Sequence, residues 1–128
     1  MSDSHTTKAR KTKTENGAVY YEYYFELFKC WINVVNTKAS IKKMLEYEEV
    51  NIDFAFKGLT FPCGSDSGFT ILLDKSNGAD ISTLAHELVH VITFIYRRIG
   101  MEKSNLPCQD ETEAYMMELL LNKFKHLV

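Results

Sequence analysis

The stretch that decides the fold is "DISTLAHELVHVITFIYRRIG", residues 80–100, because it reads as one long helix with defined ends. Asp80 is a residue type that caps helix N-termini, and Gly100 is the type that ends helices in the left-handed conformation. Apolar residues recur between them at helical spacing. Arg97 and Arg98 occupy the last turn, where positive charge is favourable. We therefore expect a helix over about residues 80–99.

This helix carries two histidines, His86 and His90, four residues apart with Glu87 between them. Residues at i and i+4 share a helix face, so both imidazoles can reach one metal ion. Glu87 points about 100° away, where it can reach a water on that metal but cannot easily bind the metal itself. This is the HExxH arrangement of a zinc site with a general base. The alternative is a structural pair of histidines, since a shuffled chain of this composition shows the motif about one time in a hundred.

The composition is that of one globular domain: 128 residues, of which 45% are hydrophobic and 25% charged. The net charge of −2 indicates no particular partner. No apolar run approaches the ~18 residues of a membrane span and the N-terminus is not a signal peptide, so a cytoplasmic protein is expected. The three cysteines, Cys30, Cys63 and Cys108, are expected to be free buried thiols, with a Cys63–Cys108 disulfide as the alternative.

The N-terminal segment "MSDSHTTKARKTKTENG", residues 1–17, has no hydrophobic periodicity and is expected to form a disordered polar and basic arm. Its cluster "KARKTK" contains no interleaved aromatic residues, so nucleic-acid binding is not expected. The folded domain is therefore expected over residues 18–128.

The rest of the chain predicts a small α+β domain. "VYYEYYFELFKCWINVV" favours a strand because it is rich in β-branched and aromatic residues, with a helix as the rival interpretation. "TKASIKKMLEYEE" has the spacing of an amphipathic helix. The expected order is β-α-β-β-α-α, with strands over 19–35, 50–61 and 68–74 and helices over 37–49, 80–99 and 110–125.

A catalytic zinc usually has three protein ligands and one open position. The helix over 110–125 offers Glu111 and Glu113, which lie about 200° apart around the helix axis, so only one can face the metal. Helical phase favours Glu113, which lies on the apolar face. Capping favours Glu111, because with Asp110 as the N-cap the Glu113 carboxylate folds back in a capping box and leaves Glu111 free.

Two segments, "LAHELVHVITFIYRRIG" and "DETEAYMMELL", carry a resemblance to the gluzincins, the thermolysin-like metallopeptidases with HExxH followed by ExxA. They are more closely similar to small HExxH proteins encoded by tailed bacteriophages. The resemblance covers about residues 68–122. It implies a minimal zincin-like domain, in which a small sheet carries two ligand-bearing helices and "GFTILLD", 68–74, is the edge strand that holds an extended peptide. It also implies that Glu111, three residues before Ala114, is the third zinc ligand.

The sequence departs from the gluzincin pattern four residues after the implied ligand. Many gluzincins have Asp or Asn there to orient a ligand histidine, whereas this sequence has Tyr115. Tyr115 and Glu118 are candidates for that supporting hydrogen bond. Tyr96, Arg97 and Tyr115 are candidates for stabilising an oxyanion, although Arg97 lies about 10 Å farther along the helix than the histidines.

The function that this resemblance implies is zinc-dependent peptide-bond hydrolysis. His86, His90 and Glu111 would bind Zn²⁺, which lowers the pKa of a bound water toward ~7, and Glu87 would act as the general base. The expected partner is a peptide or protein substrate, encountered in the host cytoplasm if the gene belongs to a phage. The alternative is a catalytically silent, zinc-stabilised binding protein on the same scaffold. The intact Glu87 favours the enzyme, because a purely structural zinc needs no general base.

Overall fold

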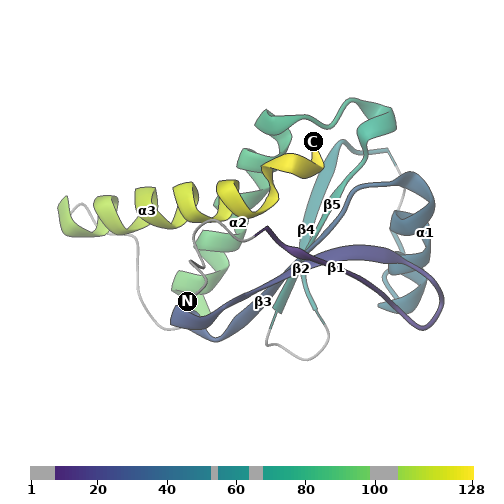
Figure 1. Ribbon diagram of the computed structural model, residues 1–128, viewed down its shortest axis with the longest axis horizontal. Coiled ribbons are helices and arrows are strands. Elements are labelled where there is room, and N and C mark those ends of the chain that lie inside the picture. Colours follow the sequence, from purple (N-terminus) through teal and green to yellow (C-terminus); the bar gives the residue numbers. More distant parts are fainter. Residues whose placement is uncertain (1–7, 53–54, 64–67, 99–106) are drawn as a thin grey trace.

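The computed structural model describes residues 8–52, 55–63, 68–98 and 107–128, with the side chains of the last segment described from Glu111 onward. Within these residues the chain forms a five-stranded mixed sheet and three α-helices, so the expected α+β class is confirmed (Figure 1). Among them, no helix combines the length and the apolar composition that crossing a bilayer requires.

The strands are β1 (Arg10–Lys13), β2 (Val19–Phe25), β3 (Cys30–Val35), β4 (Gly58–Pro62) and β5 (Gly68–Leu73). Their order in the sheet is β1-β2-β3-β5-β4. The central pair, β3 and β5, is parallel, and the other neighbours are antiparallel. A parallel pair needs a crossover connection, and here that connection carries a helix and the strand β4.

The segment predicted as one strand over residues 19–35 is an antiparallel hairpin of β2 and β3, with Phe25 opposite Cys30. A short 3-10 turn, Glu26–Phe28, and Lys29 with a φ of 51° reverse the chain direction between them. The left-handed conformation is usually taken by Gly or Asn, so a lysine in that position gives no sequence signal for a turn. The prediction that this segment forms β structure is confirmed, but the prediction of a single strand over residues 19–35 is wrong.

The arm predicted to be disordered over residues 1–17 contains a strand, so this prediction is wrong for residues 10–13. β1 pairs with β2 in antiparallel register, and the Arg10 guanidinium forms an ion pair with Glu22 of β2. Ala9 is buried, and its backbone N–H donates to the carbonyl oxygen of Lys123 at 3.2 Å. A polar strand needs no hydrophobic periodicity when ladder hydrogen bonds hold it to a neighbour. Residues 1–7 lie outside the described residues.

Helices cover both faces of the sheet (Figure 1). α1 (Lys38–Tyr47) covers one face, and the Thr37 side chain caps it by accepting from the Ser40 backbone N–H. α2 (Ile81–Arg98) and α3 (Pro107–Phe124) lie on the other face, where the larger core forms. The smaller core, under α1, consists of Ala18, Val35, Ile41, Met44, Leu45 and Leu72. The larger core includes Ile32, Val34, Phe69, Ile71, Leu73, Leu84, Leu88, Val91 and Ile95.

The strand beside the histidine-bearing helix at the sheet edge is β4, not β5 as the resemblance implied. β5 pairs on both sides, with β3 and with β4, and all six of its residues are buried. A strand of "GFTILLD" composition is apolar on both faces, which suits an interior strand covered by helices on each side. The zincin-like order β-α-β-β-α-α is likewise not confirmed, since the observed order of strands and α-helices is β-β-β-α-β-β-α-α.

Candidate metal centre

The histidine-bearing helix α2 begins after a reciprocal cap. The Asp80 carboxylate accepts from the Thr83 backbone N–H at 3.1 Å, and the Asp80 backbone N–H donates to the Thr83 hydroxyl at 3.2 Å. This is a capping box, with Thr83 in the place where Glu or Gln is common. The capping by Asp80 predicted from the sequence is confirmed, whereas Gly100, the predicted end of the helix, lies outside the described residues.

His86 and His90 converge above the surface of α2. Both are exposed, their rings are nearly perpendicular, and their Nε2 atoms are 3.3 Å apart. Two nitrogen ligands at about 2.0–2.1 Å from a tetrahedral zinc ion lie about 3.3–3.4 Å from each other. The spacing of the two nitrogens therefore fits a shared zinc ion. The same separation also satisfies a hydrogen bond between the two rings, in which the tautomers decide which nitrogen donates.

Glu87 is held in place by the edge strand β4. Its side chain is only 5% exposed, and the Thr60 hydroxyl donates to its Oε1 at 2.6 Å. Glu87 also lines an open pocket together with His86, Lys57, Gly58, Asp80, Ser82 and Thr83. A buried carboxylate costs free energy unless it is hydrogen-bonded, so the bond from Thr60 fixes the orientation of this side chain.

The close approach of β4 to α2 depends on Gly58. A Cβ at this position would lie 2.7 Å from the Thr83 methyl and 3.1 Å from both Cγ and Oε2 of Glu87. Any side chain larger than hydrogen would push Glu87 or the helix away from the strand. Thr60 and Gly58 were not identified from the sequence, because both act through contacts between β4 and α2, which are distant in the sequence.

The helix that carries the candidate third ligand starts earlier than predicted. α3 begins at Pro107, so Asp110 lies inside the helix and is not its N-cap. Proline is favoured in the first helical position, where its missing N–H costs nothing and its fixed φ is already helical. The argument that a capping box engages Glu113 is therefore wrong. It no longer favours Glu111 over Glu113 as the third zinc ligand.

Neither glutamate joins the histidines in the described part of the chain. Glu111 is exposed, while Glu113 is half-buried and lines a pocket with Val89 and Ile92 of α2. Among the described residues there is no group of three His, Cys, Asp or Glu side chains arranged to hold a metal ion. The N-terminal end of α3 extends past α2 and away from the sheet (Figure 1). A three-ligand site that uses Glu111 or Glu113 would therefore require this end of α3 to approach the histidines.

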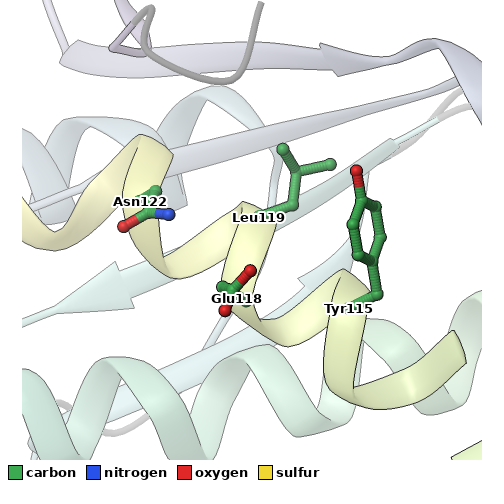
Figure 2. Close-up of a pocket in the computed structure, with 4 residues that line it drawn as sticks. All are labelled: Tyr115, Glu118, Leu119 and Asn122. Carbon is green, nitrogen blue, oxygen red and sulfur yellow. The ribbon is translucent and has the colours of Figure 1, made fainter. Parts of the chain in front are cut away.

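Tyr115 and Glu118, the candidates for orienting a ligand histidine, do not share the side of α3 on which Glu113 lies beside α2. Tyr115, Glu118, Leu119 and Asn122 line a pocket whose described lining residues all belong to α3 (Figure 2). No residue of α2 lines this pocket, and no hydrogen bond joins Tyr115 or Glu118 to His86 or His90 among the described residues. Of the other oxyanion candidates, Tyr96 is buried in the core and Arg97 is exposed near the C-terminal end of α2.

The two cysteines whose side chains are described are free thiols, as predicted. Burial raises the pKa of Cys30 to about 11. Burial also raises the pKa of Cys63, whose sulfur lies 2.8 Å from the Thr70 hydroxyl. The side chain of Cys108 lies outside the described residues.

Comparisons with protein-family models, curated proteins and solved structures find no match to this chain. The resemblance to the gluzincins therefore rests on the motifs alone, and the function is argued below from the geometry of the site.

Proposed function

We propose that this protein is a zinc-dependent metallopeptidase. The observation that carries the proposal is the 3.3 Å separation of the His86 and His90 Nε2 atoms, with the Glu87 carboxylate lining the pocket beside them. Two convergent imidazoles and an adjacent carboxylate, all from one helix, are the donor set of an HExxH site. Zinc, when bound there, supplies a Lewis acid that makes water a better nucleophile and polarises a carbonyl group.

The third ligand comes from the first turns of α3. Glu111 is the ligand that the gluzincin-like ExxA spacing implies, and Glu113 is the alternative that its packing beside Val89 and Ile92 favours. A metal ion would supply the attraction that draws this end of α3 toward the histidines, because an ion of charge +2 is the strongest local charge in such a site.

Glu87 acts as the general base. Its Oε1 accepts from Thr60, and its second oxygen, Oε2, lies on the side of Gly58, where no Cβ crowds it. A carboxylate with one oxygen fixed can take a proton from the attacking water with the other and deliver it to the leaving amine. The outer edge of β4 is free of any further described strand, so an extended peptide could pair with it beside Glu87.

The rival proposal is a zinc-stabilised binding protein without turnover. The histidine pair is compatible with this proposal as well, since the pair would hold zinc in either case. What favours the peptidase is the buried, oriented Glu87, because a carboxylate that only filled space would carry a desolvation cost without a function. If the gene is encoded by a phage, the peptidase would act in the host cytoplasm.

The test begins with zinc titration of the purified protein. One zinc per chain is expected, with affinity lost in His90→Ala. Glu111→Ala and Glu113→Ala then separate the two candidate ligands, because only the true ligand should weaken binding severely. If neither variant changes zinc affinity, the third-ligand assignment to α3 is wrong.

A cleavage screen over a peptide library then separates the enzyme from the binding protein. Glu87→Gln is nearly isosteric and leaves both imidazoles in place, so it should keep the zinc and lose nearly all hydrolysis. Unchanged cleavage by this variant would exclude the general-base assignment. A wild-type protein that binds zinc and cleaves no peptide would favour the rival proposal.

A further inference from the structure

A second pocket lies at the far end of the contact between β4 and α2. The first pocket contains Gly58, Thr83 and Glu87, at the start of both elements. The second pocket is lined by residues from the ends of the same elements and from the start of β5: Pro62, Gly68, Phe69, Phe94, Arg97 and Arg98. A peptide extended along β4 from the first pocket would therefore arrive at the second.

Helical geometry aligns this second pocket, here called the arginine pocket, with the candidate metal centre. Arg97 follows His90 by seven residues, which is two turns, so it lies on the histidine stripe about 10 Å along the helix. Phe94 follows Glu87 by the same interval and lies on the stripe that faces the sheet edge. An extended peptide covers about 10 Å in three residues. The arginine pocket is thus about three substrate residues from the scissile bond.

Stacked aromatic rings position the two arginines. Phe69 and Phe94 stack with ring centroids 5.7 Å apart and an interplanar angle of 13°. The Arg97 guanidinium lies 6.0 Å from the Phe94 centroid, and that of Arg98 lies 5.8 Å from the Phe69 centroid. Both arginines are exposed, and neither forms an ion pair with a carboxylate in the described part of the chain. Two oriented, exposed guanidinium groups over an apolar floor form a site for an anion.

We propose that the arginine pocket binds a carboxylate of the substrate peptide, from either an acidic side chain or the C-terminus. This inference rests on the proposed peptidase function, because it assigns the pocket to a peptide lying along β4. The apolar floor of Phe69, Phe94 and Pro62 would accept the carbon atoms of the bound residue. The protein would then prefer substrates with a negative charge about three residues from the cleaved bond.

The first test needs no zinc. Three peptides are titrated into the metal-free protein while the arginine Nε–Hε resonances are followed: acetyl-leucyl-glutamyl amide, acetyl-leucyl-glutaminyl amide, and acetyl-leucyl-leucine with a free carboxyl group. At least one carboxylate peptide should bind about fivefold more tightly than the neutral amide. Which of the two does so identifies the source of the carboxylate. Equal binding of all three peptides, or no binding, would overturn the proposal.

Matched variants test whether the preference for a carboxylate arises from the arginine pocket. Arg97→Gln and Arg98→Gln together should abolish the preference for the carboxylate, whereas the double lysine variant should keep part of it, because lysine retains charge without the planar fork. Lys42→Gln, on the opposite face in α1, removes an exposed positive charge elsewhere and should change nothing. A preference that survives the double glutamine variant would place the anion site outside this pocket.

The second test links the pocket to the metal centre. Acetohydroxamate binding to the zinc-loaded protein reports the metal alone. Peptide hydroxamates report the pocket when they carry Glu, Gln or a free C-terminal carboxylate three residues from the chelating group. If acetohydroxamate binds and neither carboxylate gives an advantage over Gln, the proposal about the pocket fails while the peptidase proposal stands. If the protein takes up no zinc, the peptidase proposal fails, and the metal-free titration still decides whether the pocket binds carboxylates.

Discussion

Thr60 and Glu87 lie 27 residues apart in the sequence, and the hydrogen bond between them links the sheet edge to the candidate metal centre. Thr60→Val keeps the shape of the side chain but leaves the buried Glu87 carboxylate without this donor. The free energy of unfolding should fall by about 1–3 kcal/mol, and Thr60→Ser should restore most of it. Urea denaturation measures both. In a Glu87→Ala background the valine variant should cost much less. An equal cost there would mean that the hydroxyl stabilises something other than the Glu87 carboxylate, such as the backbone carbonyl of residue 87, which lies 3.4 Å away.

Gly58 gives a second prediction at the same contact. Gly58→Ala places a methyl group 2.7 Å from the Thr83 methyl, so the free energy of unfolding should fall by about 1–3 kcal/mol. Thr83→Ser removes the opposing methyl while keeping the hydroxyl that caps Asp80. The double variant should therefore be more stable than the sum of the single changes predicts, as measured by thermal denaturation. Strict additivity would show that the crowding lies against Glu87 instead.

At the scale of elements, the cap of α2 makes stability depend on pH. Hydrogen bonds from the Thr83 backbone N–H and hydroxyl lower the pKa of the Asp80 carboxyl. A carboxyl whose pKa is lower in the folded than in the unfolded state adds stability above its unfolded value of about 3.9, and this is lost as the pH falls through the folded value. Asp80→Asn keeps a capping oxygen without the charge. Wild type should melt at a higher temperature than this variant at neutral pH, and the gap should close as the pH falls below about 4. A gap independent of pH would contradict the charge argument.

The elements also show which structural features a sequence can predict. α2 was predicted closely, because its cap and its apolar period are both local signals. The chain reversal at Lys29 was missed, because lysine rarely adopts the left-handed backbone conformation and its presence in a sequence does not indicate a turn. The start of α3 was missed because a proline such as Pro107 breaks a helix in its interior and yet is favoured as the first helical residue, so its presence alone does not locate the start. His86, Glu87 and His90 could be proposed from spacing, whereas Thr60 and Gly58 depend on how β4 packs against α2, which no local pattern contains.

At the scale of the whole molecule, the sheet places both pockets along one line. The crossover between β3 and β5 returns the chain through β4 to the edge, and α2 then packs against that edge. The candidate site therefore lies at a sheet edge where one helix supplies His86, Glu87 and His90 together with Arg97 and Arg98. Because β4 is short and ends at Pro62, the second pocket lies where strand pairing with a peptide would also end.

The opposite edge of the sheet gives the last prediction. β1 covers β2, and the Ala9 backbone bond to Lys123 fastens this strand to the end of α3. Removing residues 1–13 should lower the thermal midpoint and expose the tyrosine-rich β2 as a new edge, which promotes association between chains. Removing residues 1–7 keeps β1 and is the matched control, expected to change the midpoint much less. Thermal denaturation and light scattering at several protein concentrations measure the two effects. If the longer truncation melts like the full chain and stays monodisperse, β1 contributes nothing to the fold, and an arm without structure would be the correct description of residues 1–13.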